Sequence, residues 1–263
     1  MIENNICPYC WQPLIKAENK DNSRSVEHLI PNSALTRKRK NDEGDFYACR
    51  RCNSRKSNID YVLGVITKAQ SFDNKLALNT LIDAITKKDG RAKRFIDMIL
   101  TAKEGSGSVH MEMPIKGNEL IEYLHYLGKG QFFKVRRVPY NPNNYVMDIR
   151  FVNKQVLAAI ESSYVDQHGS NPFKDLKQNP RSEVINDGEC IIWSKNNRFI
   201  FIFHDYVAAI VEVLRRSKKN VAKAAKSESQ ILEDFSYATT SPSTRVGSCK
   251  RHERKKISHK KNT

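Results

Sequence analysis

The chain has 263 residues, of which 39% are hydrophobic and 28% are charged. This length suits one large domain or two modest ones with a buried core. The sequence contains no run of about 18 apolar residues, and it does not start with a charged segment followed by an apolar one. We therefore expect no membrane-spanning helix and no signal peptide, and we expect a cytoplasmic protein.

The formal net charge is +16. Such an excess favours a polyanionic partner, because neutralising phosphates releases counterions and gives affinity that does not depend on sequence. Residues 215–263 alone hold fourteen Lys and Arg against four Asp and Glu. An acidic membrane surface would also attract this segment, but no amphipathic anchor with bulky aromatic residues accompanies it. DNA is therefore the expected partner, with RNA as an alternative.

The chain contains two Cys-x-x-Cys pairs separated by 38 residues, Cys7 with Cys10 and Cys49 with Cys52. Each pair can turn two sulfurs to the same side, so that two pairs surround one Zn²⁺ tetrahedrally. The other two cysteines, Cys190 and Cys249, have no near partner, which indicates a reducing compartment. A structural zinc site is therefore predicted.

Between the cysteine pairs, the segment SVEHLIP predicts a short strand that ends in a turn at its proline. A strand would place His28 on one face with Val26 and Ile30, and Glu27 on the other. Residues 32–44 would then form a loop with four consecutive basic residues, Arg37, Lys38, Arg39 and Lys40. These four are either a solvated basic loop or a clamp on substrate phosphates, and both interpretations leave them exposed.

The second cysteine pair continues into the polar segment 53–58 and then into a helical pattern that starts near Ile59. Apolar residues recur at intervals of three and four up to about residue 103, which predicts three helices with a break at residues 89–90. These helices would pack behind the first unit. The GSGS segment at residues 105–108 predicts a linker or a long turn and is the candidate domain boundary.

Residues 109–217 carry mixed patterns. Phe132 to Val138 and Tyr145 to Val152 predict strands, and Asn153 to Tyr164 predicts a helix. Two apolar runs on either side of residues 195–197 predict a β-hairpin, because the two asparagines there tolerate positive φ.

The composition of the chain changes after Ser217, at the end of the last apolar pattern. Apolar residues at positions 207, 210, 211 and 214 predict an amphipathic helix. A further short helix can form after residue 217, but the rest of residues 218–263 has almost no apolar residues, so we predict a basic, disordered tail. Cys249, His252 and His259 lack a fourth ligand, which disfavours a second metal site there.

The order Cys-x-x-Cys, Glu-His-x-x-Pro, Cys-x-x-Cys-Asn-x-x-Lys resembles the zinc-containing branch of the HNH endonucleases over about residues 6–60. Proteins of that family have a ββα-metal fold, in which two strands and a helix hold one catalytic divalent cation. The expected fold class is therefore α+β. A zinc-stapled nuclease domain with a helical extension would span residues 1–104, a mixed α+β domain with a β-hairpin would span residues 109–217, and the basic tail would follow.

By this resemblance His28 corresponds to the general base, Glu27 and Asn53 to ligands of the catalytic cation, and Lys56 to a basic position near a phosphate. An imidazole with a pKa of ~6.5 can accept a proton from water near neutral pH. Oxygen ligands suit Mg²⁺ or Mn²⁺, and such a cation neutralises charge in the transition state. Nucleic-acid contacts are expected from the basic loop and from the start of the helix, that is, from Arg37, Lys38, Arg39, Lys40, Arg51 and Arg55.

Two positions depart from the family pattern. Glu27 stands where the family usually has aspartate, and Gly44 stands where an asparagine usually orients the histidine. Asp45 is the candidate for that orienting role. Taken alone, His28 would more often be a core residue on a half-buried strand, and Asn53 would more often be a helix N-cap.

The expected function is metal-dependent hydrolysis of phosphodiester bonds in DNA, by a monomer that nicks with low sequence specificity. The alternative is a zinc-stabilised module that binds nucleic acid or protein without cleavage. HNH proteins are common in anti-phage and restriction systems. The resemblance therefore also implies a regulatory subunit that docks on residues 109–217.

Overall fold

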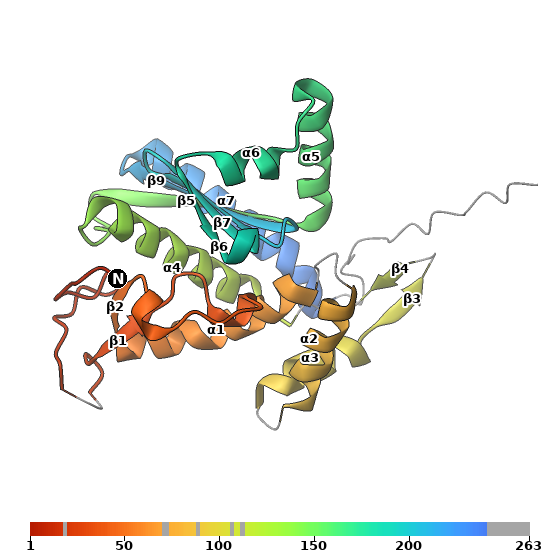
Figure 1. Ribbon diagram of the computed structural model, residues 1–263, viewed down its shortest axis with the longest axis horizontal. Helices are drawn as coiled ribbons and strands as arrows, with labels where there is room; N and C mark the ends of the chain where they lie inside the picture. Colours follow the sequence, from red (N-terminus) through yellow and green to blue (C-terminus); the bar gives the residue numbers. More distant parts are fainter. Residues whose placement is uncertain (18–19, 70–73, 88–89, 106–107, 111–113, 241–263) are drawn as a thin grey trace, which may run out of the picture.

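The computed structural model describes residues 1–17, 20–69, 74–87, 90–105, 108–110 and 114–240 (Figure 1). These residues form a mixed α+β structure with two two-stranded sheets and one five-stranded sheet. The predicted α+β class is confirmed. None of the helices in this part of the chain is long and apolar enough to span a membrane.

The N-terminal unit has the predicted order of strand, strand and helix. β1 (Arg24–Glu27) pairs antiparallel with β2 (Phe46–Cys49), with Glu27 opposite Phe46. α1 (Arg50–Ala69) follows β2 without a loop. The side of α1 that carries Ile59, Val62, Leu63 and Ile66 is buried, as the spacing of these residues predicts. β1 is shorter than expected, so His28 lies just after the strand.

The loop between β1 and β2 contains two short 3₁₀ helices, η1 (Asn32–Ala34) and η2 (Asn41–Glu43). Gly64 of α1 allows η1 to approach closely, because a Cβ at this position would lie 2.5 Å from the carbonyl carbon of Ser33. The loop is therefore packed closely onto α1.

Two more helices follow, α2 (Asn74–Thr86) and α3 (Gly90–Leu100), in agreement with the predicted helical extension. The GSGS segment was predicted as a linker or long turn. It joins β3 (Lys103–Gly105) to β4 (Ser108–His110), which pair antiparallel, while residues 106–107 lie outside the described residues.

The strand predicted at residues 132–138 is wrong, because α4 (Gly117–Arg136) continues through most of it. Two of the glycines in α4, Gly128 and Gly130, lie where other elements approach the helix closely. A Cβ at Gly128 would lie 2.6 Å from a Val211 methyl group, and one at Gly130 would lie 2.5 Å from a Leu29 methyl group. Packing around the helix therefore overrides the weak local preference for helix.

The large sheet has the strand order β5-β9-β8-β7-β6 and is antiparallel throughout. Its strands are β5 (Tyr145–Val152), β6 (Ser182–Ile185), β7 (Cys190–Lys195), β8 (Arg198–Phe203) and β9 (Val207–Arg215). The predicted strand β5 and the predicted hairpin of β7 and β8 are confirmed, and Asn196 in the hairpin turn has a φ of 57°.

The helix predicted at residues 207–214 is wrong, because these residues form β9. This strand lies between β5 and β8, and both of its faces are covered. Val211 and Val213 belong to one hydrophobic cluster, and Ala208 belongs to another on the opposite face. A strand buried on both sides has apolar residues at most positions, and these also satisfy a helical spacing.

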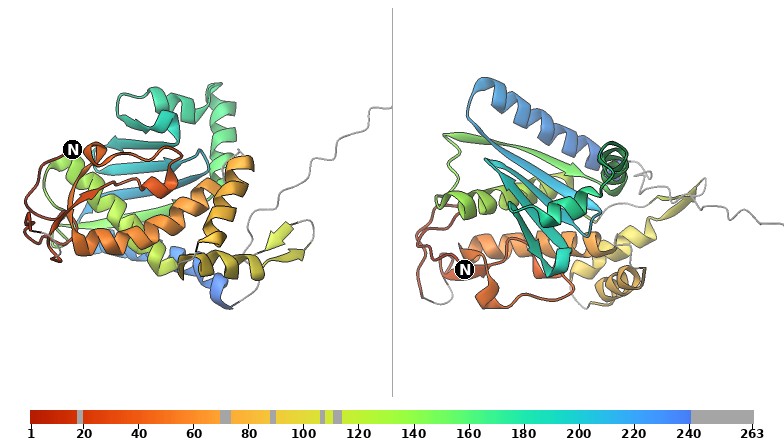
Figure 2. Two further views of the ribbon diagram at one scale, coloured as in Figure 1. Left: turned by 60° about the horizontal axis from the view of Figure 1, so that its bottom comes forward. Right: turned by 45° about the horizontal axis from the view of Figure 1, so that its top comes forward.

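Helices cover both faces of the large sheet (Figures 1 and 2). α5 (Lys154–His168) and α6 (Pro172–Gln178) pack on one face through Leu157 and Phe173. α4 and α1 lie on the other face, and α7 (Lys218–Thr240) runs along β5 and α4. The region predicted as a disordered tail therefore begins with a long helix, and residues 241–263 lie outside the described residues.

One hydrophobic cluster connects the two regions that were predicted as separate domains. It contains Leu29 and Val62 from the first region, Leu124 from α4, and Phe201 and Val211 from the sheet. The N-terminal unit thus rests on α4 and on the sheet, and residues from the second region reach the candidate site.

Candidate active site and metal centre

The four cysteines of the two pairs form a compact cluster. The Sγ atoms of Cys7, Cys10, Cys49 and Cys52 all lie within 4.8 Å of one another. Four thiolates around a tetrahedral Zn²⁺, each at about 2.3 Å, have mutual separations of just under 4 Å, so the cluster fits a structural zinc ion. This part of the prediction is confirmed as a cysteine cluster that can hold a metal such as zinc.

Local structure brings these cysteines together. Cys49 ends β2 and Cys52 lies in the first turn of α1, while Cys7 and Cys10 lie in a turn before β1. Backbone amides point at the sulfurs: the N–H of Cys49 donates to Cys7 Sγ at 3.3 Å, and the N–H of Cys52 donates to Cys49 Sγ at 3.4 Å. Such donors stabilise thiolates. A metal in the cluster would hold β2, α1 and the N-terminal turn in one unit.

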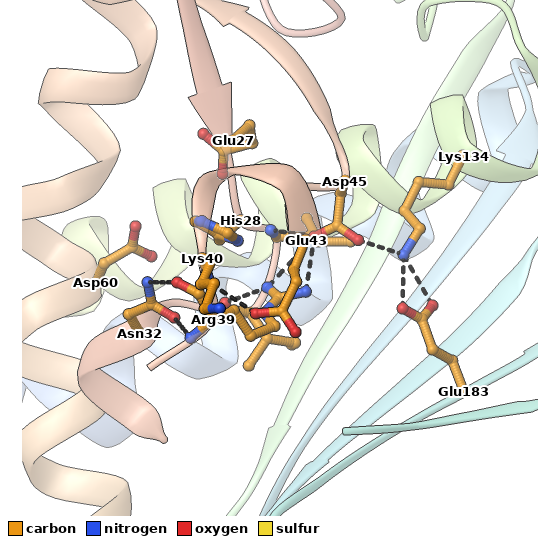
Figure 3. Close-up of polar contacts among 12 residues, drawn as sticks. Glu27, His28, Asn32, Arg39, Lys40, Glu43, Asp45, Asp60, Lys134 and Glu183 are labelled. Atoms are coloured by element: carbon orange, nitrogen blue, oxygen red, sulfur yellow. Dashed lines mark hydrogen bonds and ion pairs between the residues drawn. The ribbon is translucent and has the colours of Figure 1, made fainter. Parts of the chain in front are cut away.

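His28 is half-buried directly after β1, and its backbone is fixed on both sides (Figure 3). The Lys56 ammonium donates to the His28 carbonyl at 3.3 Å, and the next amide, that of Leu29, donates to Asp45 Oδ2 at 2.7 Å. Burial and the nearby Arg39 guanidinium lower the pKa of His28. The imidazole is therefore neutral at neutral pH, as a proton acceptor must be.

Asp45 lies next to His28 as predicted, and its carboxylate contacts the backbone that follows the histidine. It also receives a 2.7 Å ion pair from Lys134 on α4 and a 3.4 Å contact from Arg39. Burial alone would raise the pKa of Asp45, but these two cations outweigh it and lower the pKa below its ordinary value. The carboxylate is thus ionised. Within the described residues it accepts a hydrogen bond from the Leu29 amide and none from the His28 imidazole.

The Asp45 network reaches the large sheet. Lys134 also pairs with Glu183 on β6, at 2.8 and 2.9 Å (Figure 3). Lys134 is separated from Asp45 by 89 positions in the sequence and from Glu183 by 49. No sequence spacing predicts such a connection, so both residues were missed.

Glu27 and Lys56 form a buried ion pair instead of facing a substrate. Their side chains are 1% and 0% exposed, and Lys56 Nζ lies 2.9 Å from Glu27 Oε1. Asp60, one helical turn after Lys56, completes the cluster at 2.8 Å. Lys56 therefore does not lie where it could contact a phosphate, which corrects that expectation. The pairing with Asp60 has the common i,i+4 helix spacing, which the sequence contained.

The predicted catalytic cation does not fit at Glu27 in this arrangement. A divalent ion on this carboxylate would stand beside the Lys56 ammonium, which would repel it. Asn53, the second predicted ligand, uses its amide nitrogen to bind Ser25 Oγ at 2.6 Å and the Val26 carbonyl at 3.0 Å. Asn53 thus joins α1 to β1, and we assign no reaction step to a cation.

The predicted nucleic-acid-binding residues divide into two groups. Arg37, Lys38 and Lys40 are exposed, as expected, whereas Arg39 turns inward and donates to the Ile30 carbonyl at 2.7 Å. Arg51 and Arg55 lie exposed on α1. The basic loop is anchored to the sheet region, since Asn186 donates to the Arg37 carbonyl at 2.7 Å. The exposed cations Arg37, Lys38 and Lys40 therefore lie in the same loop segment as His28.

Comparison of the chain with protein-family models, with curated proteins and with solved structures gives no match. The resemblance to HNH endonucleases therefore rests on the residues quoted above. What the geometry adds is a strand–strand–helix unit, a cysteine cluster, and a histidine with a fixed backbone beside a basic loop.

Proposed function

We propose that this protein is an HNH-like endonuclease that hydrolyses phosphodiester bonds in DNA. The observation that carries the proposal is His28, which is half-exposed, uncharged at neutral pH and fixed at its own carbonyl and at the next amide. A general base needs this combination of neutrality and fixed position. The exposed cations of the neighbouring loop would hold the phosphates of the bound strand.

In the proposed reaction, His28 takes a proton from a water molecule as the water oxygen forms a bond to phosphorus. The bond between phosphorus and the 3′ oxygen breaks, and this oxygen receives a proton from solvent. Negative charge develops on the phosphate in the transition state, and nearby cations would stabilise it. A single such site acts on one strand at a time, so we expect nicks with low sequence specificity.

The role of Mg²⁺ or Mn²⁺ belongs to the same proposal. Either ion can bind Glu27 only if the Lys56 ammonium moves away, because the two cations would compete for one buried carboxylate. Substrate binding or a regulatory subunit on residues 109–217 would have to supply this rearrangement. An effector role in an anti-phage or restriction system would fit such control.

A plasmid assay tests the proposal. Supercoiled DNA is incubated with wild type or His28→Ala protein in EDTA, Mg²⁺ or Mn²⁺, and zinc content is measured on the same samples. We expect nicking by the wild type and a loss of about 100-fold or more in the variant, the usual contribution of a general base. His168→Ala is the matched control, since His168 is exposed near the end of α5.

A binding module without cleavage is the second candidate, and the Glu27–Lys56 ion pair favours it. This pair is compact and fully buried, which is typical of a structural contact rather than of an open cation site. Under this alternative the wild type shifts DNA in a gel, and neither cation produces nicking. A wild type that nicks and a His28→Ala variant that does not would exclude it.

A further inference from the structure

A pocket of about 210 Å³ opens between α1, α4 and the N-terminal cysteine turn. α1 and α4 lie side by side here (Figures 1 and 2). The buried side chains of Tyr9, Cys52 and Tyr126 line it, together with the more exposed Arg51 and Lys129. Two separate helices thus direct cations into one concavity, which no motif in the sequence indicates.

The pocket uses a different side of α1 from the His28 region. Successive residues of an α-helix point about 100° apart, so Cys52 lines the pocket while the next residue, Asn53, contacts β1. Tyr9 stands between the two regions. Its ring lines the pocket, and burial together with the nearby Glu27 carboxylate raises its pKa.

The cations that line the pocket differ in whether they form an ion pair with a carboxylate. Arg55 pairs with Glu122 at 3.0 Å, and His125 contacts Glu228 at 2.8 Å. Within the described part of the chain, neither Arg51 nor Lys129 takes part in an ion pair. Lys129 is partly buried. A partly desolvated, unpaired ammonium is costly unless an anion satisfies it.

We propose that this pocket binds a phosphate group of a nucleic-acid backbone, held by Arg51 and Lys129. The guanidinium of Arg51 can bind two phosphate oxygens at once, and Lys129 adds a point charge from the opposite helix. Tyr9 and Tyr126 are only 6% and 8% exposed, which disfavours stacking of a base on their rings. The choice of a nucleic acid rests on the proposed function, but binding is measurable without cleavage.

The nearby cysteines provide a competing explanation for these charges. Zn²⁺ with four thiolates carries a net negative charge, and Cys10 and Cys52 both line the pocket. Arg51 and Lys129 would then neutralise the metal centre instead of binding a ligand. The two explanations differ in what is lost when the cations are removed: phosphate affinity in the first, zinc in the second.

The test uses the full chain and a short fluorescein-labelled DNA duplex in buffer without added Mg²⁺ or Mn²⁺. Binding is followed by fluorescence anisotropy over a range of salt concentrations. For Arg51→Gln combined with Lys129→Gln we expect binding about tenfold weaker or more. The magnitude of the slope of log K against log salt should fall by about 2. Binding with two fewer phosphate contacts releases fewer counterions. The zinc content should be unchanged.

The matched control removes two exposed cations that do not line the pocket, with Lys174→Gln and Arg181→Gln. Lys129→Arg keeps the charge and should keep most of the affinity. Equal losses in both double variants would overturn the proposal, since only net charge would matter. Loss of zinc without a change in salt slope would also overturn it. If the wild type binds the duplex with the expected salt dependence but never nicks DNA, the proposed cleavage is wrong and the phosphate site is still supported.

Discussion

His28 is placed by contacts to its backbone, and these contacts come from residues far apart in the chain. Lys56 holds the carbonyl of His28, and Asp45 holds the amide of the next residue. Asp45 in turn is held by Lys134 and Arg39. Residues outside the N-terminal unit therefore help to hold the backbone at His28.

Lys134 is the most informative residue of this network to change. Lys134→Met leaves Asp45 with the Leu29 amide and the 3.4 Å contact from Arg39. It also removes the ammonium that pairs with Glu183, in a region where the Lys134 side chain is 15% exposed. We expect a loss of about 2 kcal/mol in the free energy of unfolding, below the value for a fully buried pair. Cleavage should fall by about tenfold or more with DNA affinity unchanged, because the base is misplaced. Urea unfolding and nicking rates measure the two effects.

The control variant is Lys134→Arg, which keeps the charge and should retain most of the nicking activity. Equal loss of activity in both variants would contradict an ionic role of Lys134.

Asp60 makes the stability of the protein depend on pH. Burial and the Glu27 charge raise the pKa of Asp60 to about 7, although Lys56 opposes this. The folded protein therefore holds a proton that the unfolded chain loses near pH ~3.9. Stability should fall as pH rises between these values, by at most about 1.4 kcal/mol per pH unit for one proton.

Asp60→Asn removes this titration. Urea unfolding at pH 5 and at pH 7.5 should show a smaller difference in the variant than in the wild type. If both proteins lose the same stability between the two pH values, the Asp60 carboxyl does not carry the proton.

At the scale of elements, α4 connects the N-terminal unit to the sheet, and its glycines make this contact possible. A Cβ at Gly130 would lie 2.5 Å from Leu29 and 3.2 Å from Phe46, two side chains with no exposed surface. Gly130→Ala should therefore lower the free energy of unfolding by about 1–3 kcal/mol through overpacking. Gly90→Ala is the control, since nothing lies within 4 Å of its Cβ. Equal stability of both variants, measured by urea unfolding, would refute a close contact at Gly130.

The same elements show what sequence patterns can and cannot predict. β5, α5 and the β7–β8 hairpin follow from periodicity and turn residues, which are local properties. The ββα order was expected from the resemblance to the HNH family. α4 and β9 were assigned wrongly at residues 132–138 and 207–214, because the buried neighbours of each element determine its structure. Cysteine spacing predicted the cluster of four sulfurs. The burial of Lys56 and the contacts of Lys134 depend on tertiary packing, which no local pattern contains.

At the scale of the whole molecule, the cysteine cluster joins the N-terminal turn to β2 and α1. Removal of its metal should loosen this region, because the surrounding hydrophobic cluster includes Tyr9, Phe46 and Phe133 together with the cysteines. Cys49→Ser should abolish binding of about one zinc per chain and lower the free energy of unfolding by several kcal/mol. Cys190→Ala is the control, since Cys190 is buried in the other core. Metal analysis and thermal unfolding give both values, and full zinc retention by Cys49→Ser would argue against the cluster as the zinc site.

The basic surfaces and the His28 region belong to one folded body, which fits a protein that binds a strand and cuts it in place. The measurement that tests this most directly is the nicking rate of wild type and His28→Ala on supercoiled plasmid, at equal zinc content and equal DNA occupancy. We predict that the variant binds DNA like the wild type and has lost nearly all nicking. Nicking that survives the substitution, or a wild type that binds DNA and nicks with neither Mg²⁺ nor Mn²⁺, would contradict the role of His28 as a catalytic base.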